Sequence, residues 1–119
     1  MKFRLLAIVS VSLLFSLPAG AATPRWFQPI VDMPTAVVHG FQCRIWHESR
    51  STFAHPNLGD NNAYGSSGIF QMEPILWNRW APLVGVHVPV WRATPYQQSL
   101  VAVEVYKFDG FSPWRDGCG

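Results

Sequence analysis

Charged side chains are scarce in this 119-residue chain, where Asp, Glu, Lys and Arg make up 13% of the residues, about half of the usual share. Two of the nine basic residues, Lys2 and Arg4, precede residue 23, which leaves seven basic and seven acidic residues in the remainder. Lys107 is the single lysine of that remainder. A near-neutral chain without a basic cluster is not typical of a polyanion-binding protein, so we expect no nucleic-acid partner.

The sequence also lacks the short motifs that hold cofactors and metals. Its four histidines, His39, His47, His55 and His87, form no His-Glu-x-x-His pattern and no zinc-type spacing with cysteine. There is no glycine-rich nucleotide loop and no Gly-x-Ser-x-Gly elbow. We therefore expect no metal, no cofactor and no serine-hydrolase chemistry.

Long apolar runs are missing except near the N-terminus, where the thirteen residues from Leu5 to Leu17 follow two basic residues. Such a run is too short to span a bilayer. Small residues at 19–22 suit cleavage of a leader, and no cysteine follows them, which argues against lipoprotein processing. The sequence predicts a signal peptide at 1–22 and a secreted protein, periplasmic or extracellular, with no membrane span after cleavage.

Cysteine is limited to Cys43 and Cys118. In an exported chain two cysteines predict one disulfide, which would tie the first helix of the domain to its C-terminal end. On the chain-entropy description, a bridge closing so long a loop stabilises the fold by about 4 kcal/mol. The alternative is a catalytic thiol, but no Cys-His arrangement with a matching motif supports it.

Tryptophan is abundant instead, and all six tryptophans follow the predicted leader. A surface with few charges and many indoles suits a neutral sugar, because an indole face packs on the C–H face of a pyranose ring. The alternative is that the indoles fill a small core. Candidates for sugar binding are Trp77, Trp80, Trp91 and Trp114.

Start and stop signals predict three helices after an irregular arm at 23–34. The helix starts are indicated by side chains that can accept from backbone N–H groups and by prolines at the first helical position. The end of the last helix is indicated by a glycine. The helices are expected at about 35–49 with Asp32 or Thr35 as N-cap, from Pro74 onward, and from the capping box of Thr94 and Gln97 to about 108, before Gly110.

The segment between the first two helices is rich in turn formers and is predicted as loop over 50–63. Residues 59–68 suit a small hairpin or a β-like loop, and the mostly apolar residues 69–72 are expected to enter the core as a buried strand. We found no internal repeat and no low-complexity tract. The fold class is therefore predicted as mainly helical α+β, with one small β element and a single domain at 35–119.

Glu48 lies on the apolar face of the first predicted helix. It follows Val37, Phe41 and Ile45 at spacings of four, four and three residues, which places all four on one face. Burial there disfavours the charged form of a carboxyl group and raises its pKa, as protonation of a glycosidic oxygen requires. The alternative is a helix-end glutamate that caps the helix or pairs with Arg44 or Arg50.

Three blocks of the chain resemble the lysozyme-like superfamily, most closely its lytic transglycosylase and resuscitation-promoting-factor-like branches. The resemblance covers roughly residues 36–118 and is most specific where the first two blocks occur together. The blocks are Glu48-Ser49, then Gly68-Ile69-Phe70-Gln71-Met72-Glu73-Pro74, then a helix at 97–106 with Gly110-Phe111-Ser112-Pro113-Trp114 and Cys118 after it.

This resemblance implies a lysozyme-like fold and cleavage of the β-1,4 bond between N-acetylmuramic acid and N-acetylglucosamine in peptidoglycan. A lytic transglycosylase does so with a single glutamate, here Glu48, which acts first as acid and then as base. The resemblance also implies a sugar cleft formed by Tyr64, Ser66, Ser67, Gln71 and some of the tryptophans, Trp77 and Trp114 among them. The expected partner is a peptidoglycan glycan strand.

Two other functions fit the same blocks. A hydrolytic lysozyme (muramidase) with a nucleophile needs a second carboxyl about 5 Å from the first, for which Asp60 is the candidate, although Ala63 stands where animal-type lysozymes carry that acid before Tyr64-Gly65. Glu73 is interpreted instead as a helix-start carboxylate. The other is a non-catalytic peptidoglycan-binding module on the same fold. A separate possibility is that the chain is an accessory part of an envelope-spanning machine and cuts the wall locally for its assembly.

Overall fold

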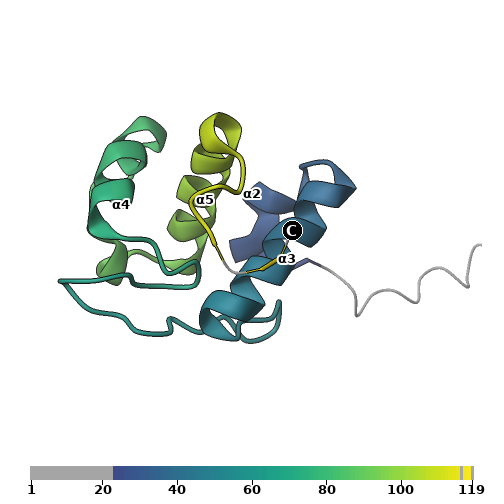
Figure 1. The fold of residues 1–119 in the computed structure, drawn as a ribbon, viewed down its shortest axis with the longest axis horizontal. Helices are drawn as coiled ribbons and strands as arrows, with labels where there is room; N and C mark the ends of the chain where they lie inside the picture. Colours follow the sequence, from purple (N-terminus) through teal and green to yellow (C-terminus); the bar gives the residue numbers. More distant parts are fainter. Residues whose placement is uncertain (1–22, 116, 119) are drawn as a thin grey trace, which may run out of the picture.

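The computed structural model describes residues 23–115, 117 and 118, so the predicted signal peptide lies outside the described residues. Figure 1 shows α5 between α4 on one side and α2 and α3 on the other, with a long non-helical segment joining α3 to α4. The elements in chain order are η2 (Arg25–Phe27), α2 (Gln28–Val31), α3 (Thr35–Ser49), α4 (Pro74–Trp80), η3 (Ala81–Val84), η4 (Val90–Arg92) and α5 (Pro95–Asp109).

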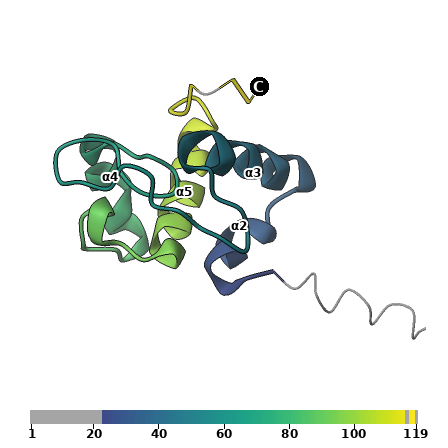
Figure 2. The ribbon, with the colours of Figure 1, turned by 90° about the horizontal axis from the view of Figure 1, so that it is seen from below.

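The expectation of an irregular arm at 23–34 is wrong, because most of this segment is helical. Both η2 and α2 pack against α5, and α2 also contacts α3. Figure 2 shows α2 below α3 at the end where the described chain begins. Phe27 and Ile30 have no exposed surface. Their burial outweighs the proline content of the segment, and Pro29 falls at the start of α2, where its missing N–H costs nothing.

Helix α3 begins at Thr35 and ends at Ser49, as predicted. Neither Asp32 nor Thr35 is its N-cap: Pro34 occupies that position, and no side chain caps the helix. The helix stops because Arg50 adopts a left-handed conformation with a φ of 60°, and its N–H returns to the carbonyl of Trp46. The predicted apolar face is confirmed at Phe41 and Ile45, which are buried.

Helix α5 is the central element, since it contacts η2, α2, α4 and η3. Its predicted capping box is confirmed: Thr94 accepts from the N–H of Gln97, and the Gln97 side chain accepts from the N–H of Thr94. The predicted stop at Gly110 is confirmed too, with a φ of 62°. None of the helices in the described part of the chain has the length and apolar character needed to cross a bilayer.

The hairpin predicted as one alternative for 59–68 and the strand predicted at 69–72 are wrong, since the described residues contain no strand. The predicted entry of 69–72 into the core is confirmed at Ile69, Phe70 and Met72, which are buried. A single antiparallel bridge joins Ser67 to Met72 through two backbone hydrogen bonds of 3.0 Å. The residues before the bridge turn because the Asn62 side-chain oxygen accepts from the N–H groups of Tyr64 and Gly65. Asparagine competes in this way with ladder pairing.

The turn at 67–72 (hereafter the motif turn) is fixed to α5 by a buried glutamine. The side-chain oxygen of Gln98 accepts from the N–H of Ile69 at 2.7 Å, and its nitrogen donates to the carbonyl of Ala93 at 3.0 Å. Gly68, with a φ of +84°, makes room for this amide, because a Cβ at that position would overlap the Gln98 side chain. The motif turn therefore depends on a contact with a residue 29 positions away.

Replacement of Gln98 by alanine is expected to lower the free energy of unfolding by about 3 kcal/mol. The change leaves one buried N–H and one buried C=O without their partners, and each such group costs about 1–3 kcal/mol. Urea denaturation monitored by tryptophan fluorescence measures the loss. Gln97→Ala, which removes only part of a helix cap, is the matched control and should cost about 1 kcal/mol. Equal losses for the two variants would contradict the anchoring role of Gln98.

Candidate active site

The C-terminal tail, of which residues 113–115, 117 and 118 are described, returns to α3, and two contacts of these residues hold it there. The predicted disulfide is confirmed: Cys43 on α3 is bonded to Cys118, with a Cα–Cα distance of 5.9 Å. Trp114 is 6% exposed, and its indole N–H donates to the carbonyl of Phe70 in the motif turn at 2.9 Å. In Figure 1 the yellow tail crosses from the end of α5 to α3. The tail thus becomes a fixed wall beside the motif turn.

The end of α3 is joined to the motif turn by Ser49. Its hydroxyl lies 2.8 Å from the carbonyl oxygen of Ile69 and 2.6 Å from the hydroxyl of Ser51. Ser51 in turn accepts from the N–H of Asn57 at 2.7 Å. These buried contacts give a physical reason for the Glu-Ser pair: the serine fastens the motif turn to the helix end that carries Glu48.

Gln71 fixes the loop that passes over the motif turn. Its backbone is left-handed, with a φ of 47°. Its side-chain nitrogen donates to the carbonyl of Gly68 at 2.9 Å and lies 3.0 Å from that of Asp60 and 3.2 Å from that of Leu58. The nitrogen is therefore engaged in holding backbone, which leaves the side-chain oxygen of Gln71 as the atom it can offer to a ligand.

A pocket of about 570 Å³ opens where these elements meet. This volume is within the range of small-molecule sites. Glu48, half-buried at the end of α3, is one of its walls, so the pocket combines a carboxyl group with hydroxyl, amide and indole groups. The residues that line it are Glu48, Ser66, Gln71, Met72, Glu73, Leu76, Pro113, Trp114 and Arg115.

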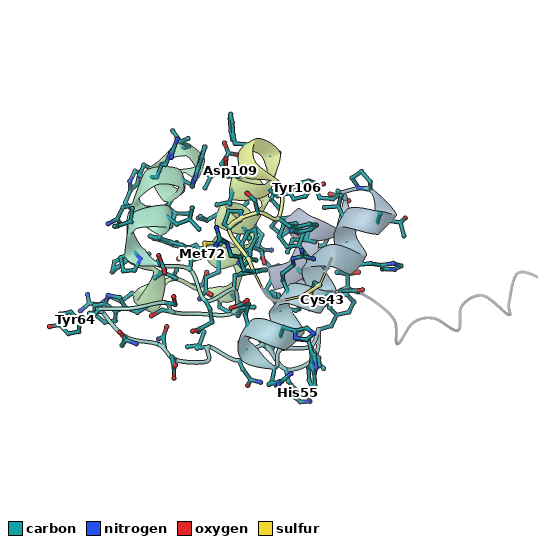
Figure 3. All side chains as sticks on the ribbon, viewed as in Figure 1. Cys43, His55, Tyr64, Met72, Tyr106 and Asp109 are labelled. Carbon is teal, nitrogen blue, oxygen red and sulfur yellow. A yellow bond between two sulfur atoms is a disulfide. The ribbon has the colours of Figure 1, made fainter. Side chains whose placement is uncertain are left out.

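Three of the predicted cleft residues line this pocket with Glu48, namely Ser66, Gln71 and Trp114. Tyr64 does not: it is 96% exposed and lies at the outer end of its loop in Figure 3. It lines a shallower neighbouring pocket of about 390 Å³ that shares Ser66 and Glu73 with the first. Tyr64 is therefore adjacent to the Glu48 pocket rather than part of its wall.

Ser67 lies inside the fold and is fully buried. Its hydroxyl accepts from the N–H of Asn62 at 2.8 Å and lies 2.7 Å from the carbonyl of the same residue. These bonds close the loop that precedes the motif turn. The structure thus gives Ser67 a loop-closing contact and no place among the residues that line the Glu48 pocket.

The other candidate tryptophans lie away from Glu48. Trp77 is 1% exposed, and its indole N–H donates to the carbonyl of Val88 at 2.8 Å. Trp80 is buried and stacks on Phe108 with ring centroids 4.8 Å apart. Trp91 is half-buried and carries the guanidinium of its neighbour Arg92 over its ring. Of the four candidates, Trp114 alone is among the residues lining the Glu48 pocket.

The second carboxyl group of the pocket is Glu73 and not Asp60. Asp60 is exposed and does not line the pocket. Sequence reasoning missed Glu73 as a site residue because it precedes Pro74 at the start of α4, which suggested a helix-start role. Its spacing from Gln71 gave no signal, because the segment is not extended: Gln71 is left-handed, with a φ of 47°. Arg115 was missed as well, and no sequence pattern identifies it.

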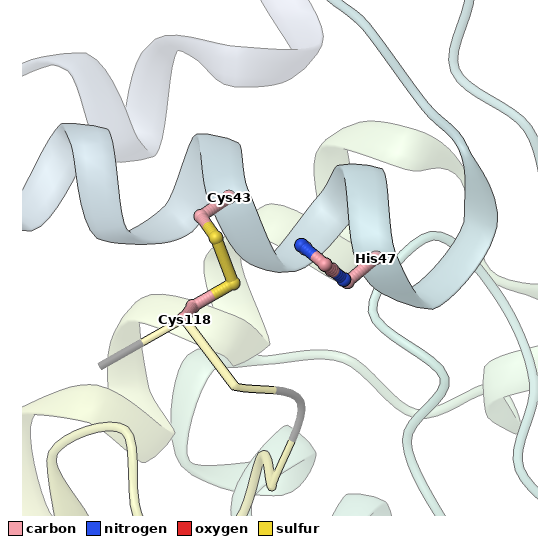
Figure 4. A group of neighbouring side chains, drawn as sticks. All are labelled: Cys43, His47 and Cys118. Atoms are coloured by element: carbon pink, nitrogen blue, oxygen red, sulfur yellow. A yellow bond between two sulfur atoms is a disulfide. The ribbon is translucent and has the colours of Figure 1, made fainter.

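One cluster has the composition of a metal site. Single ligand atoms of Cys43, His47 and Cys118 lie within 4.8 Å of one another. Figure 4 shows the histidine one turn after Cys43 on α3, beside the bonded sulfurs. Because the two sulfur atoms are bonded to each other, neither is the thiolate that binds a metal.

A second pocket, of about 460 Å³, lies beside the same end of α3 but has a different character. No acidic or basic side chain is among the residues that line it, so it offers no group for acid–base chemistry. Those residues are Gln42, Ile45, Trp46, Ser51, Thr52, Phe53 and Ala54.

Comparison of the chain with protein-family models, with curated proteins and with solved structures gave no match.

Proposed function

We propose that this chain is an exported lytic transglycosylase on a lysozyme-like fold, which cleaves the bond between N-acetylmuramic acid and N-acetylglucosamine in peptidoglycan. One observation carries the proposal: Glu48 and the motif turn, far apart in the sequence, line one pocket. The hydrogen bond from Ser49 to Ile69 holds these two parts together. A half-buried carboxyl in a concave site with convergent polar groups fits general acid catalysis.

In the proposed reaction Glu48 donates its proton to the glycosidic oxygen as the C1–O bond breaks. The bonding electrons leave with that oxygen, and the N-acetyl group of the muramic residue stabilises the oxocarbenium-like C1. The Glu48 carboxylate then accepts the proton of the C6 hydroxyl. The oxygen of that hydroxyl bonds to C1 at the same time. The product is a 1,6-anhydro-muramic end; no water is consumed, and Glu48 regains its proton.

The other walls of the pocket would bind and orient the glycan. Ser66 offers a hydroxyl and Gln71 its side-chain oxygen to hydroxyl and N-acetyl groups of the sugar. Trp114 offers apolar surface to the pocket that it lines, and its indole N–H is already bonded to the carbonyl of Phe70. Because the motif turn, the tail and α3 hold these groups at fixed places, little conformational entropy is lost when a sugar binds.

The test is the structure of the products released from purified peptidoglycan. The protein from Thr23 onward, with its disulfide formed, is incubated with peptidoglycan in water labelled with heavy oxygen, and the muropeptides are analysed by mass spectrometry. A transglycosylase gives products that are one water lighter and carry no label. Labelled reducing ends would contradict the proposal and identify a muramidase. Binding of glycan without any product would identify a non-catalytic binding module.

A hydrolytic muramidase is the second candidate, and Glu73 is the observation that favours it. Two carboxyl groups line the same pocket, Glu48 on α3 and Glu73 before α4. A glycosidase that uses water or a covalent intermediate needs such a second group, as base or as nucleophile. Asp60, the earlier candidate for this role, does not line the pocket.

Replacement of Glu73 by glutamine separates the two reactions. For a transglycosylase we expect the cleavage rate to change by less than about threefold, because the single-glutamate route needs no second carboxyl. For a muramidase the loss would be roughly 10²- to 10⁴-fold, the usual effect of a general acid or base. The rate of muropeptide release measures the effect. Asp60→Asn, which removes an exposed carboxylate outside the pocket, is the matched control.

A further inference from the structure

Arg115 gives the Glu48 pocket a positive charge at its edge. It is the only basic residue among those that line the pocket, where the other charged side chains are Glu48 and Glu73. Arg115 is exposed, so its guanidinium is accessible from solvent. A ligand that enters this pocket therefore meets a basic group on the tail side and acidic groups on the side of α3 and α4.

The backbone that carries Arg115 is fixed on both sides. The preceding residue, Trp114, is buried and bonded to the carbonyl of Phe70. Three residues after Arg115, Cys118 is bonded to Cys43 on α3. Since the tail is held at both points, the guanidinium extends from a fixed backbone beside the pocket. Less conformational entropy of the chain is then lost when a ligand binds there.

An exposed guanidinium beside a pocket suits a carboxylate, because its N–H groups match the two oxygens of such an anion. The glycan of intact peptidoglycan provides few anions of its own, since the lactyl carboxyl of the muramic residue is amide-linked to the peptide stem. The free carboxylates lie on that stem. They are attached to the same sugar whose glycosidic bond the proposed reaction breaks.

We propose, on the basis of the proposed function, that Arg115 binds a carboxylate of the peptide stem and makes the pocket selective for glycan strands that carry stems. The Glu73 carboxylate would repel an anion at the centre of the pocket, whereas Arg115 attracts it to the tail side. The stem is thereby directed toward the tail, and the uncharged sugar ring takes the place beside Glu48. Arg115 is a specificity-determining residue in this arrangement and takes no part in bond breaking.

The test measures binding to strands that are not cut during the experiment. The Glu48→Gln protein is titrated with soluble peptidoglycan strands that carry stems, and with the same strands after their carboxylates have been amidated. We expect about fivefold weaker binding of the amidated strands, the effect of one exposed ion pair near 1 kcal/mol. Addition of Arg115→Gln should weaken binding of the stem-bearing strands by a similar factor and leave the amidated strands unaffected.

Three further measurements test whether the preference depends on the charge and shape of Arg115. High salt should reduce the difference between the two kinds of strand, because it screens an exposed ion pair. Arg92→Gln is the matched control, since it removes an exposed arginine that does not line the Glu48 pocket; it should retain the full preference for stem-bearing strands. Arg115→Lys should retain part of the preference, because it keeps the charge and loses the planar fork.

The outcomes separate this inference from the proposed function. Loss of stem preference in Arg115→Gln supports the inference even if the wild-type protein cuts no glycan. Equal binding of both kinds of strand by the Glu48→Gln protein, or a preference that survives Arg115→Gln, overturns the inference even if the wild-type protein is an active transglycosylase. Absence of measurable binding to stem-bearing strands overturns it as well.

Discussion

Replacement of Glu48 by glutamine is expected to lower the rate of peptidoglycan cleavage by roughly 10²- to 10⁴-fold, the usual contribution of a general acid–base group. Glutamine has nearly the same shape but can neither donate the proton to the glycosidic oxygen nor accept one from the C6 hydroxyl. The effect is large because both steps of the proposed reaction use the same carboxyl group. Mass spectrometry of released muropeptides, followed over time, measures the rate.

Two controls distinguish a chemical effect from damage to the fold. Glu48 is half-buried at the end of a helix that is packed through other residues, so the melting temperature should stay close to that of the wild-type protein. Binding of glycan strands should also persist. Glu104→Gln, at a half-buried position on α5 that does not line the pocket, should cleave at the wild-type rate. A Glu48→Gln variant with wild-type activity would exclude Glu48 as the catalyst.

The disulfide variants are expected to show the largest loss of stability. Cys43→Ser, Cys118→Ser and the double variant each open a loop of 75 residues. On the chain-entropy description, this loss costs about 4 kcal/mol of unfolding free energy, a large share of the total for a domain of this size. Urea denaturation of the oxidised wild-type protein and of the variants measures the difference. The three variants should agree, since each removes the same bond.

The same variants also test the role of the tail in the pocket. Without the bridge, the tail loses one of the anchors described above and keeps the hydrogen bond from Trp114 to Phe70. At a temperature where the double variant is still folded, we expect cleavage and stem preference to fall while the helical circular-dichroism signal persists. Trp77→Phe, which removes an indole hydrogen bond outside the Glu48 pocket, is the stability control. Full activity in a folded double variant would contradict a structural role of the bridge in the pocket.

Local signals predicted the helices well because their ends depend on nearby residues. The capping box of Thr94 and Gln97 involves groups three positions apart, and Pro74 takes the first helical position by its own geometry. The length of α3 was also correct, although its start has no capping side chain. Propensity and capping act within a turn or two, so they can be deduced from the sequence.

The segments that were predicted wrongly depend on distant contacts. The motif turn is fixed by Gln98 of α5, and no local pattern distinguishes such a turn from the strand of a hairpin. The helical segment before Thr35 is favoured because Phe27 and Ile30 bury their side chains in the core. In both cases tertiary packing outweighs local preference, which explains why turn-forming residues alone gave a misleading prediction.

Only part of the candidate site was predicted, because some of its residues also depend on tertiary packing. Glu48 and Gln71 belong to motif blocks that can be recognised along the chain, and the pocket contains both. Glu73 and Arg115 line the pocket only because α4 starts beside the motif turn and the tail returns to α3. These two residues line the pocket because of the way the chain folds back on itself. The spacing of residues along the sequence does not predict that arrangement.

The attachment of the tail to α3 determines when the pocket can form during synthesis of the protein. Residues 113–118 leave the ribosome after every other described segment, and the bond between Cys43 and Cys118 can form only after that and after exposure to an oxidising compartment. Helices α3, α4 and α5 can therefore pack before the pocket has its last wall. The pocket is therefore completed by the last described segment to be synthesised and by an oxidation step, whereas the helices that form its other walls can pack earlier.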